Sequence, residues 1–298
     1  MSALADTAAR ARVLVIGSLN VDLILHADSE PGDEGATLVR KVTTEVGGHA
    51  GNCASALAAL GLSVALSAAV GVDADGDLLL ADLRDRGIDV TGVRRFAAEP
   101  TGRVVIPVFG DRHYMLLCRG ANDLLGAEDV LALVAGEFDA VLLFDPSVEA
   151  LYATVDAIGR LDAPPLLAWT PGGVYAGDPL AGDIVPHCDA LFLNRAEYRL
   201  LAATPAVATQ VVVTLGAEGS LLRHHGTEWQ VPVQPVPVVD PTGAGDAFAA
   251  AYLLALLAGL EPTERLEAAN RSGALAVGAV GARARLASVD DLTEVSPL

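Results

Sequence analysis

The sequence predicts an α/β protein with a doubly wound, mostly parallel central sheet flanked by helices, and a small additional β-sheet. Short aliphatic runs alternate with longer helical patterns through most of the chain, as in βα units stacked around a parallel sheet. Of the 298 residues, 52% are hydrophobic and only 4% are aromatic, which suits a large aliphatic core. This length is near the upper limit for one core, so we expect one domain, residues 1–298, with an inserted appendage.

The elements of the main sheet follow one another in order along the chain. Six β-branched or aliphatic runs are expected to be strands, at residues 13–16, 64–69, 141–144, 166–169, 190–193 and 211–215. Five segments with a helical pattern fall between or after them, at residues 50–60, 75–86, 195–202, 247–258 and 262–280. Because strands and helices alternate, we expect the carboxyl ends of the strands to share one edge of the sheet, where ligands commonly bind.

Two segments interrupt this alternation, at residues 23–46 and 94–117. Both contain alternating or β-rich stretches, and the second is predicted to turn at residues 110–111 and return as a hairpin. We expect the two segments to form the small separate sheet. Such sheets, placed over the carboxyl ends of strands, commonly act as lids in α/β enzymes.

Charge and lysine content exclude several functions. The net charge is −19 and the only lysine, Lys41, follows an arginine, so the chain has no phosphate loop of the G-x-x-x-x-G-K-[ST] type. An acidic, aromatic-poor chain is poorly suited to nucleic acid. The longest apolar stretch, residues 247–260, is shorter than the ~20 residues that cross a bilayer, and the start is unlike a signal peptide. We therefore expect a cytoplasmic protein with small-molecule chemistry and no nucleic-acid or membrane partner.

The most informative segment is Val-Val-Asp-Pro-Thr-Gly-Ala-Gly-Asp-Ala-Phe at residues 238–248. Gly243, Ala244 and Gly245 lead into a long apolar helix, whose first backbone N–H groups and positive dipole end would face an anion. Asp246 lies in the first turn, where the same field favours its ionised form. A carboxylate beside a phosphate site can accept the proton of an attacking hydroxyl group. The alternative is an Asp cap on a glycine turn.

Two further segments carry candidate contacts to a polyol. A predicted buried strand ends in Gly-Ser-Leu-Asn-Val-Asp, which presents Asn20 and Asp22 at the carboxyl edge of the sheet. A second glycine turn, Gly47-Gly48, runs into a helix of small residues with Asn52 one turn in, and its amide offers both a donor and an acceptor. The alternatives are an Asx turn at the first segment and close helix packing at the second.

Together with Asn-Arg-Ala-Glu at residues 194–197 and Val-Thr-Leu-Gly-Ala-Glu-Gly at residues 213–219, these motifs resemble the ribokinase (PfkB) family of carbohydrate and nucleoside kinases. The order of the motifs is the order in that family, and the match extends from about residue 12 to residue 290. The resemblance implies a ribokinase-like fold with a lid formed by residues 23–46 and 94–117. It also implies an ATP-dependent sugar kinase that uses Mg²⁺ and forms a homodimer through the lid.

The resemblance also implies roles for individual residues. Asp246 would be the catalytic base, with an anion hole formed by Gly243, Ala244 and Gly245. The residues that would hold the sugar hydroxyls are Asn20, Asp22, Gly47, Gly48 and Asn52. The residues that would contact ATP are Asn194, Thr214, Gly216 and Asn270. Glu197 would organise Mg²⁺ through water, as expected for an ion that keeps several waters. Asp240 and Thr242 mark a candidate site for a monovalent cation such as K⁺.

The acceptor is left open. A free ribose- or fructose-type sugar with a hydroxymethyl group is favoured, because a phosphorylated acceptor would need basic contacts that the chain largely lacks. A nucleoside such as adenosine, cytidine or pseudouridine is an alternative, with Phe109 and Tyr114 as an apolar wall for the base. A third alternative is a sugar- or nucleotide-binding sensor without catalysis.

Three residues depart from the family pattern or stay ambiguous. His49 replaces the lysine of ribokinase itself, and it either faces the substrate or bonds a neighbouring loop as a neutral imidazole. Arg119 either reaches a phosphate or acidic substrate or pairs with a carboxylate. Arg285 stands about where potassium-dependent relatives have a small hydroxyl residue, which weakens the case for activation by K⁺.

Overall fold

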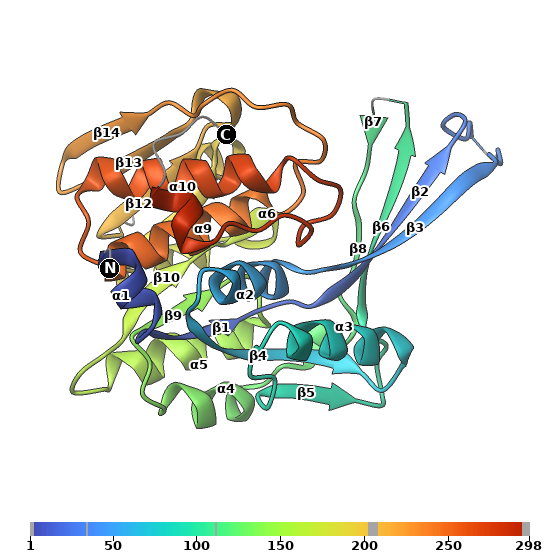
Figure 1. Ribbon diagram of the computed structural model, residues 1–298. Helices are drawn as coiled ribbons and strands as arrows, with labels where there is room; N and C mark the ends of the chain where they lie inside the picture. The colour runs from blue at the N-terminus through green and yellow to red at the C-terminus, as the bar shows by residue number, and fades with distance from the viewer. Residues whose placement is uncertain (1–2, 34, 111, 202–207, 294–298) are drawn as a thin grey trace.

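The computed structural model describes residues 3–33, 35–110, 112–201 and 208–293. A nine-stranded sheet with helices around it forms the larger part, and a second, smaller sheet projects from one end (Figure 1). Seven strands of the main sheet are parallel: β1 (Arg12–Ile16), β4 (Ser63–Gly71), β5 (Val93–Phe96), β9 (Ala140–Leu143), β10 (Leu166–Trp169), β11 (Ala190–Asn194) and β12 (Gln210–Thr214). An antiparallel edge follows, with β13 (Ser220–His224) and β14 (Thr227–Val231).

The order of the strands creates a crevice beside β1. That order is β14-β13-β12-β11-β10-β9-β1-β4-β5, so the chain leaves β1 toward β4 on one side and later returns toward β9 on the other. In open α/β sheets, ligands bind at such a switch point, outside the carboxyl ends of the strands. The segments that follow β1 and β9 are therefore expected to border a ligand site.

Helices cover both faces of the main sheet. The longer ones are α2 (His49–Ala59), α3 (Ala74–Asp85), α4 (Ala127–Val134), α5 (Val148–Gly159), α8 (Arg195–Leu201), α9 (Ala244–Leu257) and α10 (Pro262–Ala276). The shorter ones are α1 (Ala3–Ala8), α6 (Gly172–Tyr175), α7 (Ala181–Ile184) and α11 (Val289–Thr293). Short 3₁₀ turns occupy residues 120–124, 185–187 and 216–218.

Alternation along β1 divides the core into two halves. Val13 and Val15 are fully buried in the cluster that contains α2, α9 and α10. Leu14 and Ile16 point to the other face and join the cluster of α4 and α5. Because successive side chains of a strand point to opposite faces, a strand covered on both sides must be apolar throughout. This explains why the main strands appear in the sequence as continuous aliphatic runs.

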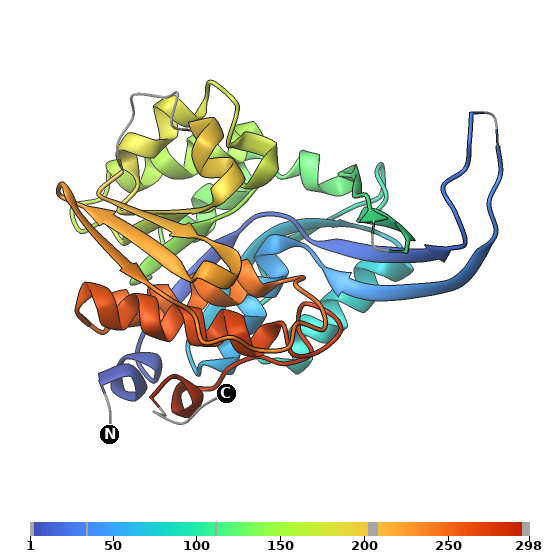
Figure 2. The ribbon, with the colours of Figure 1, turned by 90° about the horizontal axis from the view of Figure 1, so that it is seen from above.

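The smaller sheet is built from β2 (Asn20–Ala27), β3 (Val39–Gly47), β6 (Gly102–Phe109), β7 (Arg112–His113) and β8 (Leu116–Cys118). Strand β2 runs antiparallel to β3 and parallel to β6. The strands β2, β3 and β6 extend well away from the main body (Figures 1 and 2). Its other end, where β2 begins and β3 ends, adjoins the carboxyl end of β1.

The predicted fold class is confirmed, and the six predicted strands are all present with ends that differ by at most two residues. The helix predicted at 262–280 ends at Ala276, because the chain turns after Val277. The predicted lid segment 94–117 starts too early, since Val93–Phe96 pairs with β4 in the main sheet. Residue 202 of the helix predicted at 195–202, and residue 111 of the predicted hairpin turn, lie outside the described residues.

No helix in the described part of the chain is both long enough and apolar enough to span a membrane. A hairpin was predicted at His224 and His225, and β13 and β14 form it; the extent of its strands and the helices α4 and α5 were not predicted. Their existence depends on pairing with β12 and on packing against the second face of the sheet, and neither contact is visible in a local sequence pattern.

A core substitution tests this two-faced packing. Leu142 lies in β9 and is fully buried, so Leu142→Ala is expected to lower the free energy of unfolding by about 3 kcal/mol through lost contacts and a cavity. The measurement is urea unfolding monitored by circular dichroism. The matched control is Leu131→Ala on α4, where the side chain is 43% exposed and the change should be below about 0.5 kcal/mol. Equal losses in the two variants would contradict the assigned core.

Candidate active site

The predicted site residues gather around the crevice beside β1. Segments that follow β1, β11 and β12 lie at the carboxyl edge of the sheet, and the first turns of α2 and α9 begin there. Figure 1 shows α2 lying between the main sheet and the start of the small sheet. Residues distant in the sequence are thereby brought within hydrogen-bond distance.

The turn before α9 has the geometry of an anion site. Gly243 is its N-cap, with a left-handed φ of 76°, and a Cβ there would lie 2.6 Å from the Cβ of Ala282, so only glycine fits this close approach. The N–H groups of Gly245 and Asp246 occupy the second and third helical positions, where no preceding helical carbonyl is available. They are free to bind an anion at the positive end of a long helix.

The carboxylate of Asp246 is held on both of its oxygens. The side chain lies in the first turn of α9 and the residue is 5% exposed. Its Oδ1 lies 3.0 Å from Nδ1 of His49, and its Oδ2 accepts a hydrogen bond from the amide Nδ2 of Asn52 at 3.0 Å. Both partners come from the first turn of α2. The predicted base is therefore buried, oriented and provided with two donors.

His49 supplies the positive charge beside this base. The negative charge of Asp246 raises the pKa of His49 to about 10, which favours an imidazolium at neutral pH. Its ring stacks nearly parallel to that of Phe144, with centroids 6.1 Å apart. The partner of the His49 ring is thus the carboxylate of Asp246 rather than a neighbouring loop, and the raised pKa favours the charged form of the ring.

The predicted acceptor residues lie where the small sheet begins. Asn20 of β2 is paired with Gly47 of β3, and its side-chain oxygen accepts a hydrogen bond from Asn122 at 3.0 Å. Asp22 is 8% exposed, and its Oδ1 has no hydrogen-bond partner among the described residues. Burial raises the pKa of Asp22 to about 6, although the charge of Arg283 acts in the opposite direction. A buried carboxylate oxygen without a donor is suited to accept the hydroxyl groups of a ligand.

The Asn-Arg-Ala-Glu element lies at the end of β11, where Asn194 is paired with Thr214 of β12. The side chain of Asn194 accepts hydrogen bonds from the N–H groups of Ala196 and Glu197, and its own N–H donates to Oε2 of Glu197. Burial raises the pKa of Glu197, and the nearby charge of Asp246 adds to the effect while His49 opposes it. Glu197 therefore lies within electrostatic reach of the base.

Three predicted ligand residues make contacts within the protein. Asn270 on α10 is buried and donates its amide to the carbonyl of Val231, at 3.1 Å. Asp240 accepts the N–H of Thr242 on one oxygen and the N–H of Gly281 on the other, each at 2.9 Å. These hydrogen bonds lower the pKa of Asp240 against the effect of burial. Asp240 thus ties the anion turn to the loop that follows α10.

Sequence reasoning missed Asp145 and left Arg119 undecided. Asp145 follows β9 and accepts a hydrogen bond from the hydroxyl of Ser18, at 2.7 Å. Arg119 donates to the backbone carbonyl of Asp145 at 2.9 Å, and it pairs with the carboxylates of Asp123 and Asp145. It therefore pairs with carboxylates, as one of the two alternatives predicted. Its side chain is only 22% exposed. The rule that ligands bind at strand ends would have found Asp145, whereas no local pattern identifies the partners of Arg119.

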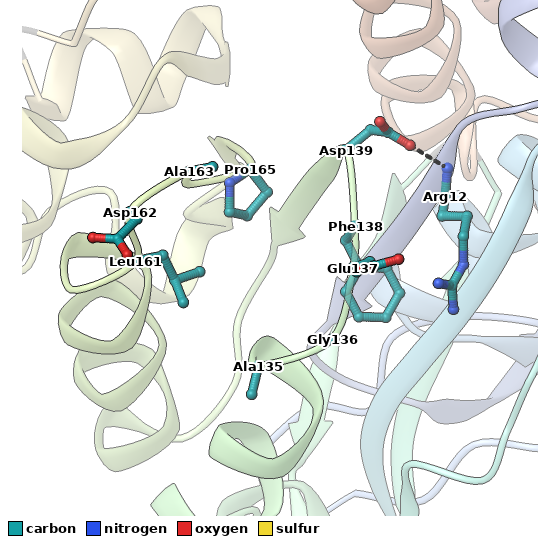
Figure 3. A pocket seen from close by; sticks show the side chains of 10 residues that line it. All are labelled: Arg12, Ala135, Gly136, Glu137, Phe138, Asp139, Leu161, Asp162, Ala163 and Pro165. Atoms are coloured by element: carbon teal, nitrogen blue, oxygen red, sulfur yellow. Dashed lines mark hydrogen bonds between the residues drawn. The ribbon is translucent and has the colours of Figure 1, made fainter.

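Arg119 lines a small hollow next to the acceptor residues. Its other lining residues are Ser18, Asn20, Arg103, Leu117, Cys118, Asn122 and Asp145. A second hollow lies at the opposite edge of the sheet, by the turns that precede β9 and β10 (Figure 3). In Figure 3 residues 161–165 line one side of it and residues 135–139 the other, where Asp139 accepts the N–H of Arg12. Because this second hollow adjoins the amino ends of the strands, it is separate from the candidate active site.

The arrangement defines a class of enzyme. A buried carboxylate next to an anion-binding helix start, with polyol contacts at the adjoining strand ends, is suited to the transfer of a phosphoryl group to an alcohol. Residues 10–288 match the family model described as "pfkB family carbohydrate kinase". The chain belongs to this family of carbohydrate kinases, which are phosphotransferases with an alcohol group as acceptor.

Individual relatives are similar over nearly the whole chain. An ATP-dependent ribose-1-phosphate kinase from Halopiger xanaduensis is 32% identical over 282 residues, covering 91% of this chain and 94% of the relative. The ribokinase of Bacillus subtilis is 28% identical, covering 95% of this chain and 98% of the relative. The structure of Arabidopsis thaliana ribokinase complexed with ribose and ATP has a TM-score of 0.82 at 25% identity, covering 95% of this chain and 97% of that chain.

The pair of His49 and Asp246 predicts a pH-dependent contribution to stability. The folded-state pKa of His49, about 10, lies above its unfolded value of 6.5. The ion pair therefore stabilises the fold fully below pH 6.5, and this contribution disappears as the pH rises through 10. Because the His49 side chain is 54% exposed, solvent screening limits the contribution to about 1 kcal/mol.

The measurement is urea unfolding of wild type and His49→Gln at pH 6 and at pH 10. The difference in the free energy of unfolding between the two proteins is expected to be largest at pH 6 and to shrink at pH 10. A difference that is the same at both pH values would show that His49 carries no stabilising charge.

Proposed function

We propose that the protein transfers the γ-phosphoryl group of ATP to the hydroxymethyl group of a free sugar of the ribose or fructose type. The observation that carries this proposal is the buried carboxylate of Asp246 at the start of α9, held by His49 and Asn52. The unpartnered oxygen of Asp22 nearby supports a polyol acceptor. A ribokinase with ribose and ATP bound shares this fold.

Asp246 acts as the general base in this proposal. It takes the proton of the hydroxymethyl group as that oxygen attacks the γ-phosphorus. The N–H groups of Gly245 and Asp246 stabilise the negative charge on the transferred phosphoryl group, and they need no reorganisation because the turn is already formed. Ala244 and Gly243 complete this turn. The imidazolium of His49 offsets the like charges of the base and the phosphates.

The acceptor is held by the residues around the start of β2. Asn20 and Asp22 bind its hydroxyl groups together with the turn of Gly47 and Gly48, while Asn52 keeps contact with the base. A free sugar matches these contacts because its hydroxyls are donors that can satisfy Asp22.

ATP is bound on the other side of the anion turn, near Asn194, Thr214, Gly216 and Asn270. Glu197 presents hard oxygen ligands of the kind that Mg²⁺ prefers, mostly through water, and the side chain of Asn194 fixes the start of α8 by accepting the N–H groups of Ala196 and Glu197. One oxygen of Glu197 accepts the N–H of Asn194, and the carboxylate retains further lone pairs for a hydrated cation. When bound there, Mg²⁺ neutralises charge on the phosphates. A monovalent cation such as K⁺ beside Asp240 and Thr242 would support the same turn.

A second acceptor class has specific support. Arg103 and Arg119 line the hollow beside Asn20, and the relative from Halopiger xanaduensis is named a ribose-1-phosphate kinase. A sugar that already carries a phosphate would place it near these guanidinium groups. Both arginines are already paired with carboxylates, Arg103 with Asp75 and Arg119 with Asp123, so the free sugar remains the first proposal.

We also propose a homodimer formed through the small sheet. Exposed apolar side chains gather on its strands and turns, where Leu38 and Met115 are each 65% exposed and Leu117 is 59% exposed. Burying such side chains against a second copy would remove apolar surface from water. The same contact would protect the edges of the sheet.

The acceptor is identified by ADP release from ATP and Mg²⁺. The panel contains free pentoses, hexoses and ketoses, nucleosides, and sugar phosphates, each with and without K⁺. The free sugars are expected to give the highest kcat/KM. Turnover confined to nucleosides or to sugar phosphates would replace the proposed acceptor, and no turnover with any member would refute the kinase activity.

The base assignment is tested by Asp246→Asn. The amide keeps the shape of the side chain but cannot accept the proton, so kcat is expected to fall at least about 10²-fold. Nucleotide affinity, measured by calorimetry, should change little because the anion turn is intact. The control is Asp162→Asn, an exposed carboxylate at the opposite edge of the sheet. Unchanged turnover in Asp246→Asn would dismiss Asp246 as the base.

A further inference from the structure

A buried arginine lies behind the acceptor turn and the base. Arg283 belongs to the loop between α10 and α11, and its side chain is 2% exposed. In Figure 1 this loop extends from α10 toward the start of the small sheet. The guanidinium forms hydrogen bonds with α2, α3 and the end of β3. Burying a charged group lowers stability unless the group is paired and its donors are hydrogen-bonded.

The contact to α2 fixes the orientation of the Asn52 amide. Nε of Arg283 donates to Oδ1 of Asn52 at 3.0 Å. Because a guanidinium can only donate, the amide oxygen must face Arg283, and the amide NH₂ must then face Asp246. This is the orientation in which Asn52 donates to Oδ2 of the base. Without Arg283, the amide oxygen of Asn52 would lose its buried donor, and only the hydrogen bond to Asp246 would orient the amide.

The other two contacts anchor the guanidinium between elements. One terminal nitrogen donates to the carbonyl of Gly47 at 2.7 Å, and the other donates to Oδ2 of Asp82 on α3 at 2.6 Å. The space is so narrow that a Cβ on Gly51 would lie 2.2 Å from the guanidinium. The charge of Arg283 also partly offsets the rise in the pKa of Asp22 that burial causes.

The loop that carries Arg283 is also joined to the anion turn. The N–H of Gly281 donates to Asp240, and Ala282 packs directly under Gly243. Within three successive residues, the loop therefore contacts the turn proposed to hold phosphate and the turn proposed to hold the acceptor. A rigid connection of this kind can set the distance between the two substrates.

We propose that Arg283 is a positioning residue for phosphoryl transfer: it fixes the Asn52 amide as a donor to Asp246 and holds the acceptor turn at Gly47 in register with the base. This inference rests on the proposed kinase activity. Arg283 acts through Asn52 and Gly47 and does not itself touch the reacting atoms.

The experiment compares wild type, Arg283→Met and Arg283→Lys in ADP release, using ATP with the acceptor that gives the highest turnover in the panel. Arg283→Met is expected to lower kcat by about tenfold to a hundredfold and to raise KM for the acceptor, while KM for ATP stays within about twofold. Arg283→Lys should recover part of kcat, since one ammonium group can replace one of the three contacts. A matched control is Arg86→Met, because Arg86 also bonds Asp82 but makes no contact with Asn52 or Gly47.

A double-mutant cycle separates positioning from a general loss of structure. If Arg283 acts on the base through Asn52, Arg283→Met should lower kcat much less in an Asn52→Ala background than in wild type. Equal losses in both backgrounds, or an unchanged kcat in Arg283→Met, would overturn the inference. Thermal unfolding and ATP affinity of each variant show whether the fold is kept. A wild-type protein without turnover refutes the proposed function itself, which is a different result from either of these.

Discussion

The site depends on a negatively charged base kept in place beside a site for another anion. Asp246 is buried in the first turn of α9, where His49 and Asn52 hold one oxygen each. The carboxylate lies at the positive end of the α9 dipole, and His49 supplies an adjacent positive charge. Both donors come from α2, so the packing of α2 against α9 in the main core fixes the geometry of the carboxylate.

The same constraint explains how an acidic chain can hold a triphosphate. With a net charge of −19 and one lysine, the protein cannot rely on a lysine-rich pocket. In the proposed mechanism, backbone amides at the anion turn and a hydrated Mg²⁺ bind the phosphates in place of lysines. Single cationic side chains act at separate positions. His49 lies at the base and Arg283 behind the acceptor turn. Most carboxylates are then free to remain solvated on the surface.

The sequence predicted the parts of the molecule that depend on local patterns. Continuous aliphatic runs predicted the parallel strands, and the glycine turn before α9 predicted an anion site with Asp246 in its first turn. The contact of His49 with Asp246 could not be derived, because 197 residues separate them. Arg283 gave no signal at all: its partner Asn52 is 231 residues away, and nothing in its neighbourhood distinguishes it from a surface arginine. Long-range polar contacts of this kind are set by tertiary packing.

The role of Asp246 as the base is tested most directly by a crystal structure with a non-hydrolysable ATP analogue, Mg²⁺ and the acceptor bound together. We expect the acceptor's primary hydroxyl oxygen to lie within about 2.6–3.2 Å of an Asp246 oxygen. We also expect the N–H groups of Gly245 and Asp246 to bind the γ-phosphate. A complex in which both oxygens of Asp246 remain closed off by His49 and Asn52, with the acceptor hydroxyl directed to another side chain, would contradict the proposed mechanism.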